Sequence, residues 1–199
     1  MENIKVMLVP LSADYREQFI LDNQRAFKYG ALEEFGKRDE HLDGDGEIIS
    51  RRTIEECIDD PASEAYRIVA EGRTVGGTVI SIDRETCRNH LELLFVSPQE
   101  HGKGIGYAAW QAIEALHPET KVWETFTPYF EKRNIHFYIN KCGFCAAEFF
   151  CDFHAGPDEP DAGESEGPSE MFRFIKVMEI IIPSLIQGMG KIKKCALAV

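Results

Sequence analysis

The chain has 199 residues, of which 22 are basic and 34 acidic, so its formal net charge is −12. This acidity argues against nucleic acid and anionic membranes as partners, because both bind basic protein faces, and it suits a cationic amine better. The sequence shows neither the pattern of a signal peptide nor an apolar run of the roughly 20 residues that a membrane span needs. We therefore expect one cytoplasmic domain.

The first part of the chain predicts one strand followed by two helices. Residues 5–11 form a short apolar run, and Ser12 is placed to cap a helix from Ala13 to about Tyr29. An acidic, glycine-bearing loop over 37–47 leads into a second helix over 50–59.

Alternating apolar residues predict a meander of three strands in the middle of the chain. Turn residues at 71–73 and 87–89 separate them. The elements that follow are one helix, one strand, one helix and two strands. The expected ranges are strands 66–70, 74–82 and 90–96, helix 107–116, strand 121–126, helix 131–141, and strands 144–153 and 171–178.

The segment between the last two strands, 154–169, is poor in apolar residues and rich in proline, glycine and acid. Such a composition is typical of a mobile loop.

The stretch from Leu91 to Ala109 places a glycine-rich turn between an apolar strand and a helix. Gly102, Gly104 and Gly106 alternate with other residues, which favours positive φ angles and a close approach of a ligand to the helix N-terminus. A Walker loop has serine or threonine after its lysine, and this loop is excluded because Gly104 follows Lys103. The glycine spacing does not match the dinucleotide fingerprint either. The turn predicts an anion site, although a turn that binds nothing is the alternative.

This turn, behind a strand that ends in Val-x-Pro, resembles the pyrophosphate loop of the GNAT superfamily of N-acetyltransferases, Gln/Arg-x-x-Gly-x-Gly/Ala. His101 stands in the Gln/Arg position, which is a departure, and Gly104 and Gly106 stand in the glycine positions. The segment NIHFYINKCGF, 134–144, is similar to the helix and strand start that close the acyl-CoA site in the same superfamily.

The resemblance implies a single α+β domain over residues 1–178, with a mixed sheet of six to seven strands flanked by four helices. Residues 179–199 lie outside it, as an extension of unknown role. The implied activity is acetyl transfer from acetyl-CoA to a small-molecule amine or a protein amine by direct attack, and a homodimer is compatible with it. The alternative is a non-catalytic acyl-CoA-binding or sensing domain, which the departures at His101 and Ile139 favour.

Glu92 occupies the strand position at which many members of the superfamily carry a general base. Simple alternation along the strand places Glu92 and Leu91 on opposite faces, with Leu94 on the face of Glu92. A carboxylate there removes a proton from the attacking amine. The competing interpretation is a solvated carboxylate, or one paired with Arg84 or Arg88.

A tyrosine four residues before the glycine of Gly-Phe often protonates the leaving thiolate in this superfamily. Counting back from Gly143 reaches Ile139, whereas Tyr138 stands one residue earlier. One residue rotates a helical side chain by about 100°, so Tyr138 is the expected acid only if the helix end is irregular. Tyr129 is the second candidate.

The resemblance also implies a set of coenzyme contacts. Backbone groups of the strand before the turn would pair with the pantetheine arm, Asn134 would bond that arm or cap its helix, and Lys103 would touch a phosphate or remain an exposed loop lysine. The residues expected to hold the coenzyme are Leu94, Phe95, Val96, His101, Gly102, Lys103, Gly104, Ile105, Gly106, Asn134 and Tyr138.

The pairs Cys142-x-x-Cys145 and Cys151-x-x-His154 have the spacing of zinc ligands, which gives a zinc-binding module as a third hypothesis. Cys142 stands inside the acyltransferase-like segment, and the second pair lies in an apolar, strand-like run. We therefore expect reduced thiols and no metal site.

Overall fold

The computed structural model describes residues 4–33, 46–151, 153–154 and 170–178. Most of the acidic loop expected at 37–47, nearly all of the segment 154–169 and the extension 179–199 lie outside the described residues.

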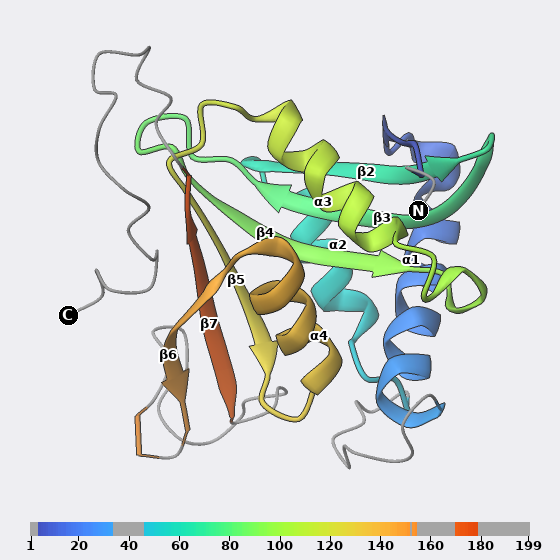
Figure 1. Cartoon of the computed structure of the whole chain (residues 1–199). Helices are drawn as coiled ribbons and strands as arrows, with labels where there is room; N and C mark the ends of the chain where they lie inside the picture. Colours follow the sequence, from blue (N-terminus) through green and yellow to red (C-terminus); the bar gives the residue numbers. More distant parts are fainter. Residues whose placement is uncertain (1–3, 34–45, 152, 155–169, 179–199) are drawn as a thin grey trace.

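A seven-stranded sheet runs through the domain in the order β1-β2-β3-β4-β5-β7-β6 (Figure 1). Neighbouring strands are antiparallel except β4 and β5, which are parallel. The strands are β1 Val6–Pro10, β2 Ser63–Ala70, β3 Arg73–Ser81, β4 Arg88–Val96, β5 Val122–Pro128, β6 Cys145–Phe150 and β7 Met171–Val177. The mixed α+β sheet expected from the sequence is confirmed.

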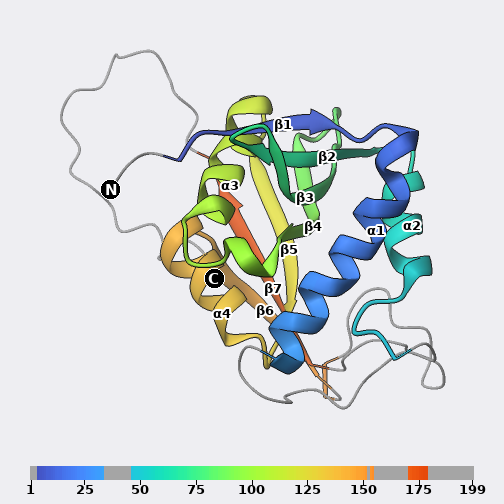
Figure 2. The ribbon, with the colours of Figure 1, turned by 90° about the vertical axis from the view of Figure 1, so that its right-hand side faces the viewer.

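In the described part of the chain, four α-helices cover the two faces of the sheet, α1 and α2 on one face, α3 and α4 on the other (Figure 2). Two π-helical segments follow α1 and α4, and a 3₁₀ turn precedes α3. The helices are α1 Ala13–Lys28, α2 Arg51–Asp59, α3 Ile105–Leu116 and α4 Lys132–His136, with π-helical Tyr29–Glu33 and Phe137–Cys142 and 3₁₀ Pro98–Glu100. Ser12 stands at the N-cap of α1 as expected, but its side chain makes no capping hydrogen bond.

Each face of the sheet has its own buried core. On the α3 and α4 side, Trp110 meets Trp123 edge to face, with ring centroids 5.5 Å apart, and both are fully buried. On the α1 and α2 side, Phe19 meets Phe95 in the same way at 5.1 Å. Burial of these large rings fixes the helices to the sheet, because the apolar area removed from water is the main favourable term in folding.

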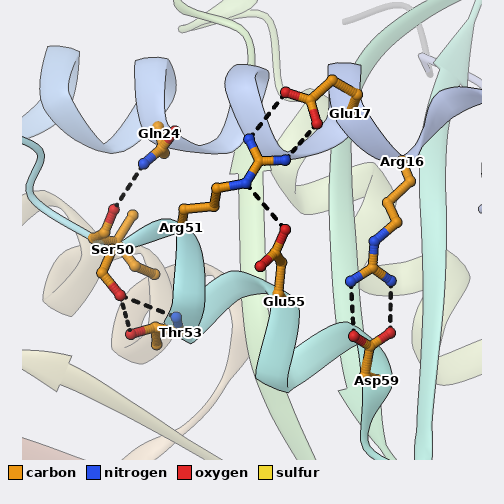
Figure 3. A network of polar contacts seen from close by, with 9 residues as sticks. Arg16, Glu17, Gln24, Ser50, Arg51, Thr53, Glu55 and Asp59 are labelled. Atoms are coloured by element: carbon orange, nitrogen blue, oxygen red, sulfur yellow. Dashed lines mark hydrogen bonds and ion pairs between the residues drawn. The ribbon is translucent and has the colours of Figure 1, made fainter. Parts of the chain in front are cut away.

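Arginine side chains link α1 to α2 along their exposed sides (Figure 3). Arg16 forms two hydrogen bonds to the carboxylate of Asp59, at 2.6 and 2.7 Å. Arg51 of α2 bonds Glu17 of α1 through both guanidinium ends and also bonds Glu55 one turn ahead on its own helix. These pairs connect the two helices at the surface, whereas the packed core supplies most of the stability.

Within the described part of the chain, no helix is both long and apolar enough to span a membrane.

Candidate active site

The strands β4 and β5 pair only where they begin and then separate. Their parallel ladder covers Arg88 to His90 of β4 against Val122 to Glu124 of β5, and the arrows in Figure 1 diverge beyond that point. The N–H of Ser97 donates to Val75 at the β3 edge. Because alternate residues of a strand direct their backbone groups to opposite edges, the N–H groups of Val96 and Leu94 face the gap beside β5. This gap is the splayed edge that the family resemblance implies.

A hollow of about 190 Å³ lies at the open end of this gap. Its walls come from the end of α1, the end of β4, the start of α3, the loop after β5, and α4 with its π-helical continuation. The described residues that line it are Ala26, Phe27, Gly30, Ile48, Leu94, Phe95, Val96, His101, Gly106, Pro128, Phe130, Glu131, Arg133, Asn134, Phe137 and Tyr138. Seven expected coenzyme residues, 94 to 96, 101, 106, 134 and 138, therefore meet at one place.

The glycine-rich turn has the backbone conformation that its sequence predicts at two of its three glycines. Gly102 and Gly104 have φ angles of +78° and +81°, and Gly104 is the N-cap of α3. Gly106 lies within the helix and has an ordinary helical backbone. The first N–H groups of α3 have no acceptor within the helix, and the helix dipole adds a partial positive charge there, so this end of the hollow favours an anion.

His101 is part of the wall of the hollow and bonds to two different elements. Its Nε2 lies 2.9 Å from the Val96 carbonyl oxygen, and its Nδ1 lies 3.0 Å from a guanidinium nitrogen of Arg133. The carbonyl can only accept and the guanidinium can only donate, so in this arrangement Nε2 acts as the donor and Nδ1 as the acceptor. Tyr29 covers the ring edge to face, with centroids 5.5 Å apart.

Lys103 is bound by a neighbouring carboxylate. Its ammonium donates to Glu100 over 2.8 Å, and the guanidinium of Arg73 lies 3.7 Å from the same carboxylate. The hydrogen bond from Lys103 holds the pKa of Glu100 below its usual value. Lys103 thus shares Glu100 with Arg73, and Lys103 does not line the hollow.

The helix end at Tyr138 is irregular. The sequence analysis requires this irregularity if Tyr138 is to be the acid. From Phe137 to Cys142 the chain forms a π-helix, and the N–H groups of Gly143 and Phe144 both bond to the Tyr138 carbonyl. A π-helical turn holds one residue more than an α-helical turn. The extra residue compensates for the offset in the sequence, so Tyr138 is buried and Ile139 is 39% exposed.

The phenol of Tyr138 lies between the hollow and the core. It is 7% exposed, and the side chains of Thr125 and Thr127 on β5 lie beside it. Burial raises its pKa to about 12, against the opposing effect of these two threonines. The group is therefore fully protonated at neutral pH, which is the form that a proton donor needs. The second candidate, Tyr129, is 49% exposed and packs on Phe149 and Phe172.

Asn134 lines the hollow from the first turn of α4. The N-cap of that helix is Glu131, so the alternative role of Asn134 as a cap is wrong.

Glu92 and Leu91 lie on opposite faces of β4 as expected, but the expectation that Leu94 shares the face of Glu92 is wrong, because a β-bulge interrupts the alternation of β4. Ile80 of β3 pairs with Leu91 and Val79 with Leu93, which leaves Glu92 as the extra residue. Leu91 packs into the core on the α3 side, but Leu93 packs with α1 and α2, and Leu94 faces the α3 side again. Burial is the main reason for the raised pKa of the Cys57 thiol on α2, and the negative charge of Glu92 raises it further, so Glu92 lies near Cys57.

Glu92 is therefore directed toward α2, away from the face of Leu94. Its Oε1 lies 2.9 Å from Nδ1 of His90, and its side chain is 30% exposed. The expected alternatives, Arg84 and Arg88, bond to Glu64 and Glu124 instead. Glu92 does not line the hollow, although it lies two residues before Leu94, which does.

Arg133, Thr125 and Thr127 are among the residues of the site that were not expected from the sequence. Arg133 reaches His101 across 32 positions of the chain, and Thr125 and Thr127 lie beside Tyr138. The two threonines alternate with larger residues along β5. This pattern predicts that they share one face of the strand, but it does not predict that this face contacts Tyr138. Nothing local to Arg133 shows that its side chain meets the glycine-rich turn.

No group of three or more metal-binding side chains is found among the described residues. Among the described residues, Cys142, Cys145 and Cys151 form no disulfide bond, and burial raises the pKa of Cys142 to about 12. His154 bonds to Glu148 over 2.8 Å.

Comparisons with known proteins agree with this arrangement. Residues 25–144 match the model of the acetyltransferase (GNAT) family. The uncharacterized protein YrkN of Bacillus subtilis strain 168 is 44% identical over 161 residues, which cover 78% of this chain and 84% of YrkN.

Two solved structures share the fold at low sequence identity. The ribosomal-protein-S18-alanine N-acetyltransferase of Escherichia coli superposes with a TM-score of 0.62 at 12% identity, covering 92% of this chain and 99% of that protein. A Bacillus subtilis acetyltransferase in complex with CoA superposes with a TM-score of 0.57 at 19% identity, covering 89% of this chain and 100% of that protein. Acetyl-CoA is the co-substrate of this family, and the chain belongs to the acetyltransferase (GNAT) family.

Proposed function

We propose that the protein transfers the acetyl group of acetyl-CoA to a primary amine by direct attack. One observation carries this proposal: the start of α3, the splayed edge of β4 and the buried phenol of Tyr138 border the same hollow. An anion-binding helix end, an unpaired strand edge and a proton donor are the three parts that a thioester with a long phosphorylated arm requires.

The coenzyme would lie along the edge of β4. Its diphosphate would accept hydrogen bonds from the N–H groups at the start of α3, and its pantetheine arm would pair with the N–H groups of Leu94 and Val96, beside Asn134. The thioester would then lie near Tyr138. The amine would enter from the α1 side of the hollow, where the walls are largely apolar, with Phe27, Ile48 and Phe130.

In the reaction the amine nitrogen attacks the thioester carbonyl carbon and the carbon–sulfur bond breaks. The departing thiolate takes the phenol proton of Tyr138. Before the attack, a proton of the ammonium form of the amine passes to Glu92, through water because Glu92 faces α2, and the proton that the new amide nitrogen later releases restores the phenol of Tyr138. Bringing a lysine-like amine with a pKa of about 10.4 to its neutral form at pH 7 costs roughly 4.6 kcal/mol, so a base contributes directly to the rate.

The first experiment is calorimetric titration of the protein with acetyl-CoA, followed by thiol release against a panel of small amines and of peptides with free amino groups. Binding with turnover supports the proposal and begins to define the acceptor. Binding without turnover on a broad panel favours the alternative function, an acyl-CoA-binding or sensing domain. Absence of binding contradicts both.

A further inference from the structure

We infer that His90 is the positioning residue of the general base: its imidazole holds one oxygen of the Glu92 carboxylate and leaves the other oxygen to take the proton of the amine. This inference rests on the proposed function, in which Glu92 is the base.

Glu92 has little support from the pairing of its own strand. It is the extra residue of the β-bulge, so no residue of β3 stands opposite it, and 30% of its side chain is exposed. A side chain in such a position keeps several rotamers unless a neighbour holds it. A base that acts through water has to be held, because a small displacement from the productive geometry lowers the rate strongly.

His90 offers a contact from the same face of β4. Its Nδ1 lies 2.9 Å from Oε1 of Glu92, and both of its ring nitrogens are shielded from water. The separation is that of a hydrogen bond, although its direction is not ideal, and a small rotation of the carboxylate would align it. Neither ring nitrogen has another hydrogen-bond partner among the described residues. An ionised carboxylate can only accept, so Nδ1 is the donor in this contact.

The imidazole is itself held by the sheet. His90 is the last residue of the ladder between β4 and β5, with Ser81 of β3 and Glu124 of β5 as its neighbours in register. Its ring packs against Phe126 of β5 with centroids 5.4 Å apart, and Phe126 stacks on Phe150 of β6 at 6.0 Å. The donor therefore stands on a well-packed part of the sheet, at the point where β4 and β5 begin to separate.

The other titratable groups around this pair have partners of their own or are uncharged. Glu124 of β5 is bonded by Arg88 of β4 and Arg173 of β7. Cys57 of α2 lies near Glu92, and burial raises the pKa of this thiol to about 11, which keeps it neutral at pH 7. The imidazole is thus the group placed to hold the carboxylate.

The two oxygens of Glu92 then have different roles. One stays bonded to the N–H of His90. The other takes a proton from the ammonium form of the amine through water, which leaves the neutral amine for the attack on the thioester. Glu92 returns this proton to solvent after the products leave. The contact keeps the second oxygen directed at the same water in each turnover.

Three replacements of His90 separate the donor from the ring. His90→Asn places an amide N–H close to the position of Nδ1, His90→Gln places its amide nearer to that of Nε2, and His90→Phe keeps a ring against Phe126 without a donor. We expect His90→Phe and His90→Gln to lower kcat at pH 7 about tenfold or more and His90→Asn to retain most of it. The KM for acetyl-CoA should change less than about threefold, because other groups bind the coenzyme.

The pH profile of kcat/KM and a double variant show whether His90 acts through Glu92. The deficit of His90→Phe should shrink as the pH approaches the pKa of the amine, where the neutral amine forms without a base. The double variant with Glu92→Gln should be no slower than Glu92→Gln alone, because the two residues act as a unit.

His154→Phe is the matched control. His154 also lies close to a carboxylate, with 2.8 Å between its Nε2 and Oε1 of Glu148, and it also stacks on a phenylalanine, Phe150. It does not line the hollow. We expect His154→Phe to change kcat/KM less than about threefold, since its contact does not involve the base.

Urea unfolding at pH 7 tests the contact without any substrate. If His90 and Glu92 bond to each other, each single replacement removes the same contact. The midpoint of the double variant His90→Phe with Glu92→Gln should then fall by less than the sum of the two single shifts.

Several results would overturn the inference. These are an unchanged kcat in His90→Phe, a deficit that His90→Asn shares in full, a deficit that stays constant with pH, and a deficit that His154→Phe matches. Additive urea midpoints would overturn it even without a known acceptor. If the midpoints are coupled but the unmodified protein acetylates no amine, the proposed function fails while the contact stands, which is a different outcome.

Discussion

The N–H of Phe144 bonds to the carbonyl of Tyr138 over 2.9 Å, and the two rings pack edge to face with centroids 5.5 Å apart. This relationship holds the wide π-helical turn closed and directs the phenol inward. A wide turn of this kind is frequent at functional sites, because it changes the direction of a single side chain without ending the helix.

Replacing Tyr138 with phenylalanine should lower kcat about 100-fold, the usual contribution of a positioned proton donor, and leave the affinity for acetyl-CoA nearly unchanged. Steady-state kinetics and calorimetry measure the two quantities. Tyr129→Phe is the control and should have little effect. If Tyr129→Phe lowers kcat as much as Tyr138→Phe does, the assignment of the acid is wrong.

Tyr138 should also make stability depend on alkaline pH. Its pKa is about 12 in the folded protein, above the value of about 10 for an unfolded chain, so its stabilising effect is complete below pH 10. This contribution, which is roughly 3 kcal/mol at most, is lost as the pH rises toward 12. Urea unfolding between pH 9 and about 11.5 should show a steeper loss for the unmodified protein than for Tyr138→Phe. Equal slopes would contradict the burial effect.

Replacing Glu92 with glutamine should lower kcat/KM about 100-fold at pH 7, because the attacking amine then keeps its proton. The deficit should shrink as the pH approaches the pKa of the amine, where the neutral amine forms without a base. A pH series of kcat/KM is the measurement. Glu56→Gln, an exposed carboxylate of α2, provides the comparison. A deficit that stays constant with pH would indicate a structural role for Glu92.

The two glycines at the start of α3 should respond differently to alanine. Gly104 has a φ angle of +81°, so Gly104→Ala should destabilise the fold by about 1 kcal/mol. Gly106→Ala meets only ordinary contacts at 3.6 Å in a helical position, and it should keep or raise stability. It also adds a methyl group to the wall of the hollow and should weaken CoA binding. Thermal unfolding and calorimetry separate these effects, and Gly106→Ala with unchanged CoA affinity would place the coenzyme elsewhere.

The ion pairs between α1 and α2 should matter at acid pH. Hydrogen bonds from Arg51 and Arg16 lower the pKa values of Glu17 and Asp59 below their usual range. Carboxylates with lowered pKa values stabilise the fold above their unfolded pKa, near pH 4, and lose this effect as the pH falls further. Urea midpoints from pH 6 to 3 should therefore fall less in a variant with Arg16→Gln and Arg51→Gln than in the unmodified protein. High salt should reduce the difference, since both pairs are exposed.

The amino-acid sequence by itself determined the order of the strands and helices along the chain and the position of the glycine-rich turn. Apolar periodicity marks each element. The positive φ angles of the turn follow from the glycines at 102 and 104, because glycine adopts such angles readily. Such features depend on neighbours a few positions apart.

Only the tertiary structure decided which way the reactive side chains point. The bulge at Glu92 depends on how β3 pairs with β4, the inward turn of Tyr138 depends on the packing of Phe144, and the contact of Arg133 with His101 spans 32 positions. Each follows from burying side chains that are distant in the chain. A shift of one residue reverses a strand face or turns a helical side chain by about 100°, so the direction is set by the core and not by the local pattern.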